Sequence, residues 1–202
     1  DVLGSRGLGD VYKRQVPPCT LEITDAETFA RDWTVIDVNS DVSANTWAYN
    51  DGNAMYTQDK SNAADDWLIA PAVTLEAGKA YKVSAYVKHS STFGSDKQKI
   101  ELKIGTAPTV EGLTTRLVYD ESFQSRLFVE KSGTFSPAES GVFYVGLRCY
   151  SESYNGDLYF QKIVIEEAPV YPAQITDLSI VAGERGAMSA TLSWTWPSSD
   201  HL

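Results

Sequence analysis

The chain has 202 residues, of which 43% are hydrophobic, 22% charged and 11% aromatic, and its formal net charge at pH 7 is -10. This length permits one large β domain, or one domain and part of a second. The negative charge argues against nucleic acid as a partner, because phosphate binding needs clustered Lys and Arg. Since no apolar run approaches about 18 residues, we predict no membrane span in this stretch.

Residues 1–15 are rich in glycine and charge and show neither the period of a strand nor that of a helix. We expect them to be unstructured. Residues 7–15 also resemble a linker-derived stretch that recurs at the ends of translated environmental reads, so they carry no information on the fold. The first domain is therefore expected to begin at Val16.

Short strand-like segments separated by polar turns follow. The residues from Thr24 to Glu27 can cap one short helical turn, and no long helix is predicted. The aromatic and β-branched content favours strands over helices. Strands are expected at residues 19–23, 33–37, 117–119, 127–135, 141–150 and 158–165.

Two further segments, residues 81–88 and 99–104, alternate apolar with polar side chains. This period is typical of a strand with one face buried and the other in water. In the first segment, the wet face is formed by Lys82, Ser84, Tyr86 and Lys88. Each segment is therefore predicted to be a half-buried strand of an antiparallel sheet.

The pair Asn155-Gly156 favours a hairpin, because both positions tolerate the positive φ of a type I′ turn. About eight or nine short strands without a long helix favour two stacked sheets. We therefore predict an all-β fold, a jelly-roll β-sandwich, for residues 16–167.

An acidic, proline-containing segment, residues 168–173, has the composition of a linker. Residues 174–202 contain two strand-like segments around Gly183 and Gly186. A β-sandwich takes about 100 residues, so residues 174–202 are predicted to be a truncated β domain.

The stretch from Asp65 to Leu75 combines two acids, an aromatic residue, an apolar run and a proline. Trp67 and Ile69 are expected on one side of a strand and Leu68 on the other, and Pro71 limits pairing there. The stretch is mainly a signature of the fold, and only its leading acids remain candidates for function.

A calcium site is the sharpest chemical hypothesis. Acidic and amide side chains alternate in the polar loop after residue 36, so their oxygen atoms can converge, and the acids at 65 and 66 can complete an oxygen cage for Ca²⁺. The alternative is that these side chains only form turns. The predicted metal ligands are Asp37, Asn39, Asp41, Asp65 and Asp66.

A binding face for sugar or peptide is the second hypothesis. Aromatic rings and carboxylates flank Asn155-Gly156, and this combination suits glycan binding. The alternative is that the rings are core residues or cross-strand partners. The predicted ligand-binding residues are Tyr150, Glu152, Tyr154, Asp157 and Tyr159.

No catalytic constellation is predicted. The chain has two histidines, His89 and His201, and His201 lies in the truncated tail. A Ser-His-Asp or Cys-His arrangement would therefore depend on His89 alone. The side chain of His89 is expected to face solvent at a strand end. Cys19 and Cys149 allow two interpretations, a disulfide or two separate thiols.

Several motifs recur in the order found in one known family. They are WTVID at 33–37, DDWLIAP at 65–71, GTAPT at 105–109, YVGLR at 144–148 and LYFQKI at 158–163. Together they resemble the cleaved-adhesin or choice-of-anchor J type of bacterial surface domain, which is related in shape to MAM domains. DDWLIAP is the most specific, since it is similar to that family's D-[DN]-[WY]-L-I-[ST]-P. Residues 172–197 resemble the first two strands of a fibronectin type III domain, with Trp194 at that family's core tryptophan.

The resemblance implies a secreted or cell-surface module that is not an enzyme. Such a module binds extracellular protein or glycan as one unit of a multidomain protein, with calcium as a candidate stabilising cofactor. The alternatives are a structural spacer that presents a neighbouring domain and, more remotely, a fragment of a carbohydrate-active enzyme.

Overall fold

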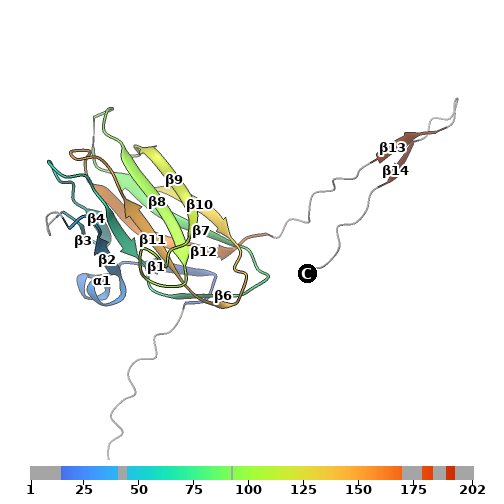
Figure 1. Ribbon diagram of the computed structural model, residues 1–202, viewed down its shortest axis with the longest axis horizontal. Coiled ribbons are helices and arrows are strands. Elements are labelled where there is room, and N and C mark those ends of the chain that lie inside the picture. The colour runs from blue at the N-terminus through green and yellow to red at the C-terminus, as the bar shows by residue number, and fades with distance from the viewer. Residues whose placement is uncertain (1–14, 41–44, 92, 170–178, 184–189, 194–202) are drawn as a thin grey trace, which may run out of the picture. The chain divides into compact units, whose positions relative to one another are not determined.

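The computed structural model describes residues 15–40, 45–91, 93–169, 179–183 and 190–193 (Figure 1). The chain divides into two compact units, Asp1–Ala168 and Pro169–Leu202. The division falls inside the segment that the sequence predicts to be a linker.

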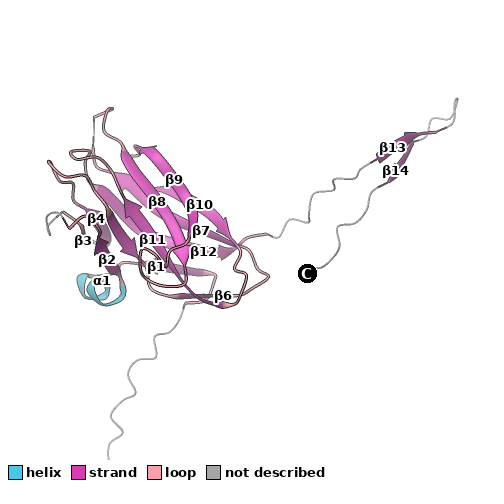
Figure 2. Cartoon of the chain, in the orientation of Figure 1, coloured by secondary structure: helices cyan, strands magenta, loops and turns pink. Residues whose placement is uncertain are grey.

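The first unit is a sandwich of two antiparallel sheets, and strands dominate it (Figure 2). Sheet I contains, in order, β10 (Val129–Phe135), β7 (Tyr81–His89), β12 (Leu158–Glu167), β4 (Asn53–Tyr56) and β3 (Trp47–Asn50), with β1 (Cys19–Glu22) also paired to β12. Sheet II contains, in order, β2 (Thr34–Asp37), β5 (Asp66–Ile69), β11 (Gly141–Cys149), β8 (Gln98–Gly105) and β9 (Thr115–Phe123), with β6 (Val73–Leu75) also paired to β11. The predicted jelly-roll β-sandwich is confirmed.

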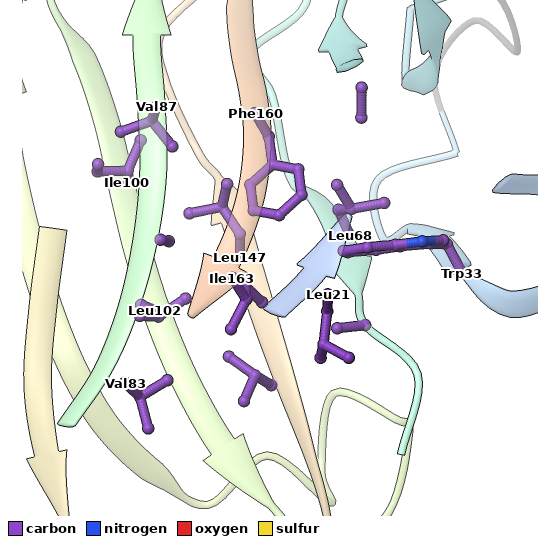
Figure 3. Close-up of a cluster of buried hydrophobic side chains, with 14 of the residues drawn as sticks. Leu21, Trp33, Leu68, Val83, Val87, Ile100, Leu102, Leu147, Phe160 and Ile163 are labelled. Carbon is purple, nitrogen blue, oxygen red and sulfur yellow. The ribbon is translucent and has the colours of Figure 1, made fainter. Parts of the chain in front are cut away.

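Apolar side chains from the two inner faces form the core (Figure 3). Trp33 meets Phe160 edge to face, with ring centroids 5.2 Å apart. Complete burial of one large apolar side chain contributes about 1.5–3 kcal/mol relative to exposure. Other buried members of this core are Leu21, Leu68, Val83, Val87, Ile100, Leu102, Leu147 and Ile163.

One short helix, α1 (Ala26–Asp32), follows β1. It begins at Asp25, whose carboxylate accepts a hydrogen bond of 2.7 Å from the amide of Thr28, as an N-cap does. It ends because Trp33 adopts an extended backbone. The predicted helical turn is thus confirmed. Within the described ranges, no helix has the length and apolar character needed to cross a membrane.

The stretch from Asp65 to Leu75 behaves as the sequence predicts. Leu68 joins the core between the sheets, whereas Trp67 and Ile69 pack with Leu113 in a separate cluster on the other side of sheet II. Pairing is interrupted between β5 and β6, where Pro71 lies, and both strands pair with β11.

The predicted hairpin at Asn155-Gly156 is wrong. β11 pairs with strands of sheet II and β12 with strands of sheet I, so residues 150–157 cross from one sheet to the other. The positive φ values in this loop belong to Tyr154 and Gly156. Positive-φ residues are present, but they shape a crossover connection and not a two-residue turn.

The two cysteines are separate thiols. Cys19 lies in sheet I and the fully buried Cys149 in sheet II. Burial raises the pKa of the Cys149 thiol to about 12, and burial also raises the pKa of Cys19. Of the two interpretations of the cysteines, the structure shows the one without a disulfide.

Gln15 departs from the expectation that residues 1–15 are unstructured. It forms a parallel bridge with Val73, and its carbonyl accepts a hydrogen bond of 2.8 Å from the amide of Thr74. Residues 1–14 lie outside the described part of the chain. The described pairing of the first unit therefore begins one residue before Val16, where the domain is predicted to begin.

In the second unit, β13 (Ser179–Ala182) and β14 (Ala190–Ser193) form an antiparallel pair in which Ile180 lies opposite Leu192. Trp194 lies outside the described residues. The assignment of this unit as the start of a fibronectin type III domain stays a prediction.

Candidate binding surface

The outer face of sheet I carries a continuous row of side chains from neighbouring strands. Tyr159 of β12 lies opposite Lys88 of β7 and Met55 of β4. Phe128, directly before β10, approaches Lys88 from the other side. The Lys88 Nζ atom lies 4.5 Å from the ring centroid of Tyr159 and 4.8 Å from that of Phe128. We call Met55, Tyr159, Lys88 and Phe128, which are all half-buried, the aromatic row.

The alternation of β7 explains why this row faces outward. Val87 and His89 are buried, so Lys88 between them projects from the opposite face. Tyr86, two residues earlier, also faces outward, and the Lys162 Nζ atom lies 5.1 Å from its ring centroid. The wet face predicted for residues 81–88 is confirmed at Lys82, Tyr86 and Lys88, whereas Ser84 is 3% exposed and donates a hydrogen bond to Glu130.

The lysines of this face differ in their partners. Lys82 lies 2.5 Å from Glu130 and lowers the pKa of that carboxyl. Lys162 lies 3.9 Å from Glu22. Lys88 forms no ion pair within the described part of the chain, and its ammonium group lies against the two aromatic rings. The aromatic row therefore contains a cation that no nearby carboxylate neutralises.

The outer face of sheet II is organised differently. Arg148 donates two hydrogen bonds, of 2.7 and 2.8 Å, to Asp65. Glu101, which is 3% exposed, lies near Arg148 and also pairs with Lys103 and Arg116. These charges are matched within the protein, so a ligand on this face would have to compete with existing ion pairs.

The structure gives Asp65, one of the five predicted calcium ligands, a different partner. Both of its carboxylate oxygens accept hydrogen bonds from Arg148, which therefore already supplies a positive charge. Asp65 also lines a surface pocket of about 540 Å³. The other lining residues are Asn39, Ser61, Asn62, Ala63 and Ala64.

The remaining predicted calcium ligands lie in and after the β2–β5 pair. Asp37 is directly opposite Asp66, which is fully buried. Asp37 accepts a hydrogen bond from the amide of Ser40, and the Asn39 side chain donates one to the carbonyl of Ala63. Asp41 lies outside the described residues.

Nothing among the described residues groups three His, Cys, Asp or Glu side chains as a metal site would. A buried carboxylate opposite a second carboxylate is nevertheless an arrangement that a cation would stabilise. The calcium site stays a prediction. Of its five predicted ligands, Asp37, Asn39 and Asp66 lie in the described part of the chain and are not bound by Arg148 in the way that Asp65 is.

The five predicted ligand-binding residues do not form one surface. Tyr159 belongs to the outer face of sheet I. Tyr150 follows β11 and stacks on Tyr119 at 6.0 Å on the outer face of sheet II, where burial raises the pKa of its hydroxyl. Their separation follows from the crossover between β11 and β12.

The other three predicted ligand-binding residues lie in the crossover itself. Glu152 forms an ion pair of 2.7 Å with Lys99. Asp157 accepts a hydrogen bond of 3.1 Å from the amide of Gln58, while Tyr154 is 64% exposed. Of the predicted set, Tyr159 is the residue that belongs to the aromatic row.

Four residues of this face, Lys88, Phe128, Tyr86 and Met55, are not among the candidates that the sequence predicts. The alternation of residues 81–88 already indicates that Tyr86 and Lys88 face water, and that signal could have selected them. No comparable signal marks Phe128, which precedes its strand.

The expectation that His89 faces solvent is wrong. The residue is 1% exposed, and its Nε2 atom lies 2.5 Å from the carbonyl oxygen of Asn155. β7 extends to His89, so the alternation directs this side chain inward, as it does that of Val87.

No protein-family model and no curated protein matches the chain. Among solved structures, the K3 cleaved adhesin domain of Lys-gingipain from Porphyromonas gingivalis W83 is 11% identical, with 73% of this chain and 98% of that chain covered and a TM-score of 0.54. The K1 cleaved adhesin domain is 14% identical, with 75% and 99% covered and a TM-score of 0.53. The apo structure of BiXyn10A CBM1 is 20% identical, with 75% and 98% covered and a TM-score of 0.51. At these identities the similarity shows a shared fold.

Proposed function

We propose that the first unit is a non-catalytic binding module of a secreted or cell-surface protein, and that the outer face of sheet I is its glycan-binding surface. The observation that carries this proposal is the aromatic row, in which the half-buried rings of Tyr159 and Phe128 lie on either side of Lys88. Flat aromatic faces provide apolar area against which a sugar ring can stack.

The shared fold supports a binding role. The similar structures are cleaved adhesin domains and the carbohydrate-binding module CBM1 of BiXyn10A. The sheet also provides rigidity, because β7 and β12 pair along most of their length. Rings held on paired strands lose little freedom when a ligand binds.

The proposal is tested by binding of the full chain to an array of soluble plant, bacterial and host glycans. We expect Tyr159→Ala to weaken glycan binding by about tenfold, since stacking on one ring contributes about 0.5–1.5 kcal/mol beyond area burial. Tyr150→Ala makes the same change on the outer face of sheet II and serves as the matched control, with affinity expected to stay unchanged.

Two results would contradict the proposal. A folded chain that binds no glycan would favour the role of a structural spacer. Loss of binding in Tyr150→Ala, with Tyr159→Ala unaffected, would instead assign the binding surface to sheet II.

A further inference from the structure

Lys88 is an unusual cation in a chain whose formal net charge is -10. Most lysines of the first unit pair with carboxylates, such as Lys82 with Glu130 at 2.5 Å and Lys99 with Glu152 at 2.7 Å, whereas Lys60, Lys88 and Lys97 form no ion pair among the described residues. Within the described residues, Lys88 has the rings of Phe128 and Tyr159 in place of an acid.

The two rings position the ammonium group without neutralising it. Attraction to a ring face comes from the quadrupole of the ring, so the full positive charge remains. The ammonium has three N–H donors and no acceptor. Donors that do not point at a ring face can therefore bind an anion that approaches from solvent.

We infer that the aromatic row binds acidic polysaccharide, in which a sugar unit carries a carboxylate or sulfate group. The inference rests on the proposed glycan-binding function and specifies its ligand class. The anionic group binds the Lys88 ammonium, and the ring of the same or the adjacent sugar stacks on Tyr159.

The strand register supports this assignment. Lys88 and Tyr159 are direct partners across β7 and β12, and directly opposite side chains begin about 4.5–5.5 Å apart. In the folded chain the Lys88 Nζ atom lies 4.5 Å from the ring centroid of Tyr159, so a sugar unit that contacts this ring also lies within reach of the ammonium group.

Carboxylates of sheet I have partners within the protein, and that of Asp157, two residues before Tyr159, accepts a hydrogen bond of 3.1 Å from the amide of Gln58. Glu130 pairs with Lys82, and Glu22 lies 3.9 Å from Lys162. Interactions with more distant acids are screened over about 8 Å at physiological ionic strength. The overall negative charge of the chain therefore does not prevent an anion from binding at Lys88.

The test compares three polymers by calorimetry with the full chain at about 0.15 M salt. They are polygalacturonate, its carboxyl-reduced neutral form, and a sulfated galactan. We expect at least one charged polymer to bind about tenfold more tightly than the neutral form, as one charge-assisted hydrogen bond provides. The charged polymer that binds more tightly shows whether the anionic group is a carboxylate or a sulfate.

Variants of Lys88 identify the cation. Lys88→Met keeps an apolar side chain between the rings but removes the charge, and it should lose about tenfold in affinity for the charged polymer. Lys88→Arg keeps the charge and should retain most of the binding. Lys60→Met removes an exposed lysine elsewhere and should have no effect, and a thermal melt of each variant checks folding.

Equal or tighter binding of the neutral polymer, with Lys88→Met unaffected, would overturn the inference and leave the glycan-binding function standing. Binding of neutral array glycans with no binding of either charged polymer would likewise overturn the preference for acidic polysaccharide and leave the glycan-binding function standing. Failure to bind any glycan, charged or neutral, would remove both the inference and the proposed function.

Discussion

Gly156 shows how one residue determines the path between the two sheets. Its φ is +84°, a conformation that side-chain-bearing residues rarely adopt. A Cβ atom added there would lie 2.7 Å from His89 Nε2 and 3.0 Å from the Cβ of Ser91. The crossover loop packs directly on the buried histidine, and this contact requires glycine.

We predict that Gly156→Ala lowers the free energy of unfolding by about 1–3 kcal/mol, because it adds a steric clash to an unfavourable φ. Gly78→Ala is the matched control. Gly78 has a φ of +80° but open space around its Cβ position, so only the backbone cost of about 1 kcal/mol applies. Urea denaturation measures both values, and equal losses would show that the packing against His89 contributes nothing.

The same loop illustrates what a sequence can predict at the scale of a residue. The predicted type I′ turn needs a positive φ at both Asn155 and Gly156, but of these two residues only Gly156 has one. Turn residues do not specify which sheet the next strand joins. That choice depends on pairing with β7 and β4, which no residue in the loop encodes.

Strands with a strong alternation are predictable from the sequence, whereas a solvent-exposed strand is less so. Residues 81–88 alternate clearly, and β7 adds only His89 to them. The sequence predicts only residues 117–119 of β9, which runs from Thr115 to Phe123. Most of its side chains are exposed or half-buried, because it is an edge strand of sheet II, so it lacks the apolar signal of a core strand.

The β2–β5 pair is the element where the calcium prediction is tested. Asp37 and Asp66 are direct cross-strand partners, and like charges in this position destabilise a sheet. We expect millimolar Ca²⁺ to raise Tm relative to the chelated protein, because a ligand that binds only the folded state stabilises it.

Asp37→Asn should abolish the calcium-dependent increase in Tm. Asp65→Asn should leave that increase in place while lowering Tm itself, because Asp65 is the partner of Arg148. Identical melting curves with calcium and with chelator would remove calcium as a cofactor of this unit.

At the scale of the whole molecule, the predicted fold class is confirmed, while the composition of the binding surface needed the structure. Lys88 and Tyr159 are far apart in the sequence and become neighbours only because β7 pairs with β12. Conversely, Tyr150 and Tyr159 are close in the sequence but belong to different faces. Periodicity in the sequence shows which side chains of a strand face solvent. The order of strands in the sheet determines which of these solvent-facing side chains become neighbours.

The most direct test of the binding surface is a titration of the isotope-labelled chain with short galacturonate and xylose oligosaccharides, followed by backbone amide chemical shifts. Glycan binding at the aromatic row should shift amides of β7, β12 and β4 and of Phe128, and leave those of β5, β8 and β11 in place. Shifts confined to β5, β8 and β11, or no shift with either sugar, would contradict the assignment of the binding surface to sheet I.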